Sequence, residues 1–112
     1  MKLAITKEFT EKMDLLMERI TMDYNAFRGT NARKDSTVFT YDTGKKYARV
    51  WQIDSQKRCW GFVVMSTDDV KFQYGDILKS ASWKAPARNY ARGNIFGDHT
   101  IRWTGQMDIL DA

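Results

Sequence analysis

The sequence predicts an α+β fold in which one N-terminal amphipathic helix packs on a small, mainly antiparallel β-sheet of about four strands. Two observations predict it. Apolar residues recur at steps of three and four over residues 6–27, and they then fall into short runs over residues 37–79; these are the patterns of a helix and of strands. The chain has 112 residues, the size of one domain with one modest core. We therefore expect residues 1–112 to form a single two-layer domain.

The predicted helix covers residues 6–27. Thr6 is placed to cap its first turn, and Gly29 can adopt the left-handed conformation that ends a helix. Because side chains three and four positions apart share one helix face, we expect the apolar stripe to face the sheet. A stripe rich in methionine can also form an adaptable binding face, but ordinary core is the simpler interpretation. The stripe consists of Phe9, Met13, Leu16, Met17, Ile20, Tyr24 and Phe27.

Residues 37–79 are predicted to form an antiparallel meander. The strand runs are residues 38–41, 46–53, 58–66 and 77–79, separated by turns rich in Asp, Gly and Ser. The third run is almost entirely apolar, which predicts a central strand covered on both faces. Gly61 within it indicates a bulge or the close approach of another backbone. Asp68 and Asp69 follow, and we expect them to form a solvated turn.

The positive charge is unevenly distributed. The chain carries a net charge of +4, and residues 79–102 alone hold five basic residues against one acidic residue. An excess of one sign over a short stretch raises the local potential and attracts anions. This stretch is therefore the first place to look for a binding site.

Residues 80–105 form a basic and aromatic motif segment. Pro86 can open a short C-terminal helical turn that Gly93 closes, which would bring Lys84, Arg88 and Arg92 to one face. Arginine grips phosphate or carboxylate with two hydrogen bonds, and aromatic rings stack on bases. An equally weighted alternative is a solvated helix face that Trp83 anchors in the core. The candidate ligand-binding residues are Lys79, Trp83, Lys84, Arg88, Tyr90, Arg92 and Asn94.

Enzymatic, metal and membrane functions find little support. The sequence lacks a phosphate-binding glycine loop, and its single cysteine, Cys59, cannot form an internal disulfide or a zinc site alone. No apolar run reaches the roughly 18 residues that span a bilayer, and Lys7 and Glu8 interrupt any leader-like stretch. We therefore expect no catalytic residues, no metal, no cofactor and no membrane partner, in a cytoplasmic protein.

The motif segment and the strand before it resemble a known family. The sequences Gly-Asp-Ile-Leu-Lys at 75–79, Ala-Ser-Trp-Lys-Ala-Pro-Ala-Arg at 81–88 and Ala-Arg-Gly-Asn-Ile at 91–95, with Trp-Thr-Gly at 103–105, are similar to motifs of small, functionally uncharacterised tailed-bacteriophage proteins. The resemblance covers roughly residues 45–105. It implies a phage accessory protein made inside a bacterial host cell, and it implies no activity.

Two functional hypotheses from different classes follow. The first is a non-enzymatic binding module whose motif segment engages an anionic ligand: nucleic acid, a nucleotide or an acidic patch on a host protein. A phage setting would make interference with host defence or host machinery its purpose. The second is a structural or homo-oligomeric interaction protein, in which the motif is only an architectural loop.

Overall fold

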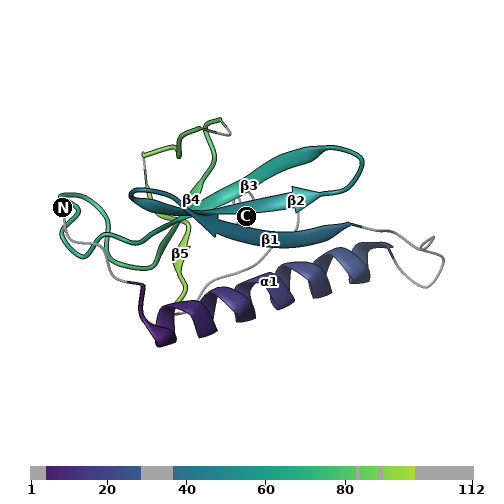
Figure 1. Ribbon diagram of the computed structural model, residues 1–112, viewed down its shortest axis with the longest axis horizontal. Coiled ribbons are helices and arrows are strands. Elements are labelled where there is room, and N and C mark those ends of the chain that lie inside the picture. Colours follow the sequence, from purple (N-terminus) through teal and green to yellow (C-terminus); the bar gives the residue numbers. More distant parts are fainter. Residues whose placement is uncertain (1–4, 29–36, 83, 89, 98–112) are drawn as a thin grey trace.

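The computed structural model describes residues 5–28, 37–82, 84–88 and 90–97, which form a helix and a five-stranded sheet (Figure 1). The helix, α1 (Lys7–Arg28), runs along β1 and covers one face of the sheet. The strands are β1 (Val38–Thr43), β2 (Tyr47–Ile53), β3 (Lys57–Val64), β4 (Asp76–Lys79) and β5 (Gly93–Asn94). The predicted α+β fold is confirmed.

The predicted helix is confirmed, and five of the seven stripe positions are buried; Met17 is partly buried, and the side chain of Phe27 lies outside the described residues. The hydroxyl oxygen of Thr6 accepts a hydrogen bond from the backbone N–H of Phe9 at 3.0 Å, which satisfies one of the free donors of the first turn. The buried positions on α1 are Phe9, Met13, Leu16, Ile20 and Tyr24. The methionine-rich stripe is therefore core, as expected. Gly29, the expected helix end, lies outside the described residues.

The sheet is a meander with one more strand than expected. Each strand pairs antiparallel with the next, in the order β1-β2-β3-β4-β5. The fifth strand comes from the motif segment: Asp76 pairs with Asn94, and Ile77 pairs with Gly93. Two residues are too few for an alternating pattern to be visible in the sequence, so β5 could not be predicted.

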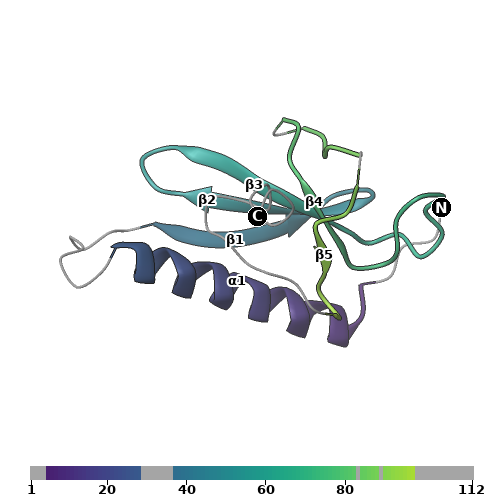
Figure 2. The same ribbon diagram turned by 180° about the vertical axis from the view of Figure 1, so that it is seen from behind.

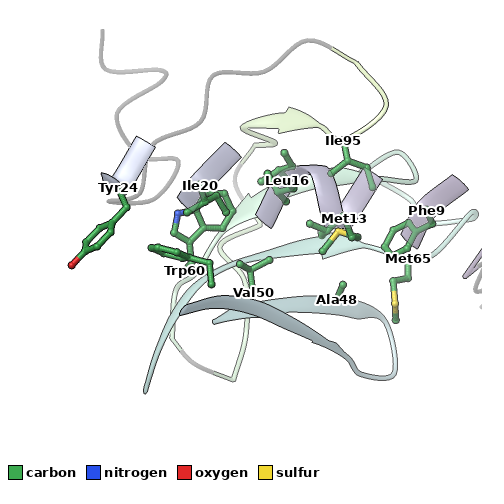
Figure 3. Close-up of a cluster of buried hydrophobic side chains, with 13 residues drawn as sticks. Phe9, Met13, Leu16, Ile20, Tyr24, Ala48, Val50, Trp60, Met65 and Ile95 are labelled. Atoms are coloured by element: carbon green, nitrogen blue, oxygen red, sulfur yellow. The ribbon is translucent and has the colours of Figure 1, made fainter. Parts of the chain in front are cut away.

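Strand β3 carries both irregularities that Gly61 indicated. Val50 pairs with Gly61 but Trp51 pairs with Cys59, so Trp60 is an extra residue in a β-bulge. The bulge places Trp60 in the core between the sheet and α1, where Figure 3 shows it beside Ile20. A Cβ atom on Gly61 would lie 2.8 Å from the carbonyl oxygen of Leu78. Only glycine allows β3 and β4 to approach this closely.

In the part of the chain that the structure describes, loops cover the second face of the sheet. Phe62, Val64 and Leu78 form a separate buried cluster there, completed by Phe72 from the β3–β4 loop, and Ala91 packs against it. Figure 2 shows the chain after β4 rising on the side of the sheet away from α1. The predicted burial of β3 on both faces is confirmed, and it depends on two loops being held in place.

The helical turn expected over residues 86–91 is not seen in the residues described there. Pro86 instead forms an isolated antiparallel bridge with Ser80. The N–H of Ala87 donates to the oxygen of Lys79, and that of Arg92 donates to the oxygen of Ile77, both at 2.7 Å. These bonds to β4 hold the segment along the sheet and replace the contacts of a helical turn; residue 89 lies outside the described residues.

The first prediction concerns the close approach at Gly61. We expect Gly61→Ala to lower the free energy of unfolding by about 1–3 kcal/mol, because the added methyl group overlaps a backbone oxygen that cannot move without separating β3 from β4. Urea denaturation measures the change. Gly44→Ala is the matched control, because its Cβ would lie 3.4 Å from the nearest atom. Equal stability of the two variants would contradict the close approach.

Candidate functional site

A buried carboxylate lies at the base of the loop that covers the second face. The side chain of Asp69 is 0% exposed. Its Oδ1 atom accepts hydrogen bonds from the backbone N–H groups of Lys71 at 2.8 Å and Phe72 at 2.9 Å. Aspartate readily closes a turn in this way. These bonds place Phe72 in the buried cluster and give the carboxylate a fixed orientation.

Arg88 of the motif segment binds this carboxylate with both ends of its guanidinium fork. Its Nη2 atom lies 2.9 Å from Oδ1 of Asp69, and its Nη1 atom lies 3.2 Å from Oδ2. Nη1 also donates to the hydroxyl of Tyr47, at the start of β2. The guanidinium carbon lies 4.8 Å from the centre of the Phe72 ring. Arg88 thus joins the motif segment, the β3–β4 loop and β2 at a single point.

Two lysines complete the group. Nζ of Lys46, in the β1–β2 turn, lies 2.9 Å from Oδ2 of Asp69. Nζ of Lys71 donates to the backbone oxygen of Arg88 at 2.6 Å. We call Lys46, Lys71 and Arg88 the cationic cluster. The side chains of Lys46 and Arg88 remain 33% and 35% exposed, so positive charge reaches the surface above a fully buried acid.

The electrostatics of the group follow from these contacts. Hydrogen bonds from Arg88, then from Lys46 and the backbone, hold the pKa of Asp69 far below its usual range, against the opposing effect of burial. The same carboxylate raises the pKa of Lys46 and of Arg88. All three groups are therefore charged at neutral pH, as a buried ion pair requires.

A second polar group fixes the turn before β4. Nδ2 of Asn94 donates to the backbone oxygen of Tyr74 at 2.9 Å and to Oδ1 of Asp76 at 3.0 Å. Asp76 in turn accepts from the N–H of Gln73. Between them Gly75 has a φ of +87°, and a Cβ there would lie 2.7 Å from the ring of Phe96. Asn94 therefore holds the turn and the end of β5 together.

Six of the seven predicted residues are described by the structure, and it does not bring these six together into one anion cradle. Arg88 is bound to Asp69, and Asn94 is bound within the fold. Arg92 is only 5% exposed, and its guanidinium carbon lies 4.0 Å from the ring centre of Tyr90. Lys79 is half-buried in β4, whereas Lys84 and Tyr90 are exposed. Trp83 lies outside the described residues.

The sequence analysis missed the buried acid. Asp69 was expected in a solvated turn beside Asp68. That expectation is wrong, because the side chain of Asp69 is buried. Arg88 and Lys46 supply the positive charge that compensates this burial. The only local signal is an aspartate whose carboxylate accepts hydrogen bonds from the backbone N–H groups two and three positions later. That signal indicates a turn, and it gives no sign of the distant arginine.

An open hollow of about 250 Å³ lies against this group, lined by Lys46, Ser66, Asp68, Asp69 and Val70. Asp68 accepts a hydrogen bond from the hydroxyl of Ser66 at 2.8 Å. Within the described ranges no three acidic, histidine or cysteine side chains come together to hold a metal ion. No helix in the same ranges is long and apolar enough to cross a membrane. The chemistry of the hollow is that of one lysine amine beside two carboxylates.

The second prediction concerns Asp69. We expect Asp69→Asn to lower the free energy of unfolding by about 2–4 kcal/mol at pH 7, because it leaves Arg88 and Lys46 without their counter-charge in a partly buried place. Because the pKa of Asp69 is lowered on folding, its contribution is complete at neutral pH and declines as the pH falls below about 4. Urea denaturation between neutral and acid pH measures both effects.

Asp68→Asn is the matched control, since it removes the same charge from the neighbouring, exposed residue. We expect it to cost less than about 1 kcal/mol. The account of the buried acid would be wrong if the two variants had the same stability at pH 7, or if the difference between Asp69→Asn and the wild type did not shrink in acid.

A known protein family matches nearly the whole of this chain. A family model described as "Family of unknown function (DUF7717)" matches residues 1–108. The match extends over α1, which the resemblance at residues 45–105 left out, and it includes Asp69 and the motif segment. No curated protein and no solved structure matches the chain. Because the family model spans nearly the entire sequence, the chain belongs to DUF7717, a family of unknown function.

Proposed function

We propose that this protein is a non-enzymatic binding module that engages a phosphate-bearing anionic ligand, a nucleic acid or a nucleotide, through the cationic cluster. One observation carries the proposal: Lys46 and Arg88 bind a single buried carboxylate, and the amine of Lys71 is held beside them by the backbone oxygen of Arg88. Even when exposed Asp68 is counted with Asp69, the group keeps an excess positive charge. Such an excess raises the local concentration of anions.

The roles of the three cations differ. Both nitrogens of the Arg88 fork are occupied by Asp69 and Tyr47, so Arg88 is a positioning residue. An ammonium group has three donors, and Lys46 and Lys71 each use one in the contacts described above. Their remaining donors are available to phosphate oxygens. Because both amines are already held in place, binding would order them at a lower entropic cost than free lysines.

This proposal moves the ligand site away from the motif segment. The contacts were expected from seven residues between Lys79 and Asn94, and of these only Arg88 belongs to the cationic cluster. In this proposal the other predicted residues shape the loop that presents Arg88 to Asp69. Lysine contacts to phosphate carry no base specificity, so we expect binding to depend strongly on salt and weakly on sequence.

The resemblance to tailed-bacteriophage proteins supplies the biological setting of the proposal. The protein would be a phage accessory protein in the cytoplasm of the bacterial host. Its anionic ligand would then belong to host defence or to host machinery that the phage modifies. An acidic patch on a host protein is the competing anion, and the experiment below separates it from phosphate.

The third prediction tests the cationic cluster. We expect Lys71→Glu to weaken binding of a fluorescein-labelled single-stranded oligothymidylate about tenfold at low salt, with a smaller slope of affinity against salt, because one phosphate contact is lost. Fluorescence anisotropy measures both. Lys45→Glu is the matched control, since it makes the same charge change at an exposed turn residue beside Lys46. ATP and polyglutamate serve as competitors.

The outcomes decide the proposal. The proposal is supported if only Lys71→Glu loses affinity for the oligonucleotide and if ATP competes better than polyglutamate. Equal loss in both variants indicates diffuse attraction by net charge and overturns it, as does a wild-type protein that binds no oligonucleotide. If polyglutamate competes better than ATP, the ligand is an acidic protein surface, and the proposal of a phosphate-bearing ligand is overturned.

A structural or oligomeric interaction protein is the second candidate. Arg88 and Asn94 of the motif segment are both bound within the fold, as an architectural loop requires. Under this alternative, light scattering shows a homo-oligomer whose size does not change with salt or ATP, and the oligonucleotide does not bind.

A further inference from the structure

We infer that a hollow between α1 and the turn after β5 binds an acidic side chain of a partner protein. The hollow has a volume of about 70 Å³ and lies on the helix side of the molecule. The cationic cluster packs on Phe72 in the opposite face of the sheet. The inference therefore goes beyond the proposed function and does not depend on it.

Two cations and several apolar side chains line the hollow, and most of the surface that they expose in it is polar. Its floor includes Leu16 of α1 and Ile95, both buried and placed near each other in the core of Figure 3. Lys12 and Arg19 line it from α1. They are seven residues apart, which is about two turns, so they lie on the same side of the helix with Leu15 and Leu16 between them.

No ion pair joins Lys12 or Arg19 to an acidic residue within the part of the chain that the structure describes. In that part of the chain, two positive charges without an ion-pair partner therefore border the hollow. An incoming carboxylate gains two favourable charge contacts there without displacing an existing one.

The size and lining favour a single acidic side chain over a nucleotide. Sites for nucleotide-sized ligands usually exceed about 300 Å³, whereas this hollow has about 70 Å³. The methylene groups of glutamate can contact Leu15 and Phe96, which are partly exposed in the lining, while the carboxylate reaches Lys12 and Arg19. Leu15 and Met22, 44% and 69% exposed, continue an apolar surface along the same helix face. A partner segment that alternates acidic and apolar residues fits this pattern of charge and surface.

The fourth prediction tests the hollow with a defined probe. A fluorescein-labelled peptide of alternating leucine and glutamate is titrated against the protein, and the same peptide with glutamine in place of glutamate is the uncharged comparison. Fluorescence anisotropy measures the affinity of the peptide for the protein, and methyl NMR shows whether the peptide shifts the signals of Leu16 and Ile95. We expect Lys12→Gln and Arg19→Gln each to weaken binding about two- to fivefold, the range of exposed ion pairs. Lys7→Gln is the matched control on the same helix, outside the hollow.

Shifts of the Leu16 and Ile95 methyl signals by the acidic peptide alone, lost in Arg19→Gln but kept in Lys7→Gln, support the inference. Unmoved methyl signals, equal binding of the glutamine peptide, or equal losses in Lys7→Gln and Arg19→Gln overturn it. Inorganic phosphate is titrated separately, and if it shifts the same methyl signals where the peptide does not, the hollow is a phosphate site and the inference fails. Lys71→Glu should bind the peptide normally, which separates this result from the proposed function.

Discussion

The fold depends on one buried charge. The side chain of Asp69 is buried, and its carboxylate is tolerated there because Arg88, Lys46 and two backbone amides bind it. Among the described residues α1 covers one face of the sheet, and loops cover the apolar residues of the other face. The ion pair fixes those loops: it joins the β1–β2 turn, the β3–β4 loop and the segment after β4. Without it, Phe72 would lack a fixed position over Phe62 and Leu78.

The need to compensate the buried carboxylate of Asp69 also explains why positive charge lies on the surface beside it. Burying a carboxylate requires cations, and cations grouped for that purpose project beyond it to solvent. The binding module that we propose would thus use a structural necessity as its ligand site. The two faces of the molecule then differ in character. Lys46, held by an ion pair, and Lys71, held by a backbone oxygen, lie on the loop-covered face. A small recess beside α1 is lined by two cations that have no ion pair among the described residues. Each can be tested while the other is intact.

The elements that could be predicted from the sequence are those determined by the spacing of apolar residues within one segment. The helix and four strands follow from spacing within each segment, and Gly61 correctly indicated both the bulge and the close approach to Leu78. The ion pair could not be predicted, because Asp69 and Arg88 are 19 residues apart and no periodic pattern links them. The sequence from Pro86 to Arg92 has the composition of a helical turn. Hydrogen bonds to β4 determine its path instead, and such tertiary contacts override local preference.

The central claim is that Asp69 and Arg88 act as one unit, and a double-mutant cycle tests it most directly. Asp69→Asn, Arg88→Gln and the double variant are each unfolded in urea at pH 7, with the wild type. If the two side chains form the ion pair that holds the loops, the losses are non-additive by about 1–3 kcal/mol, because either substitution already removes the contact. Losses that add within about 0.5 kcal/mol would show that the two residues stabilise the protein independently, and would contradict the account.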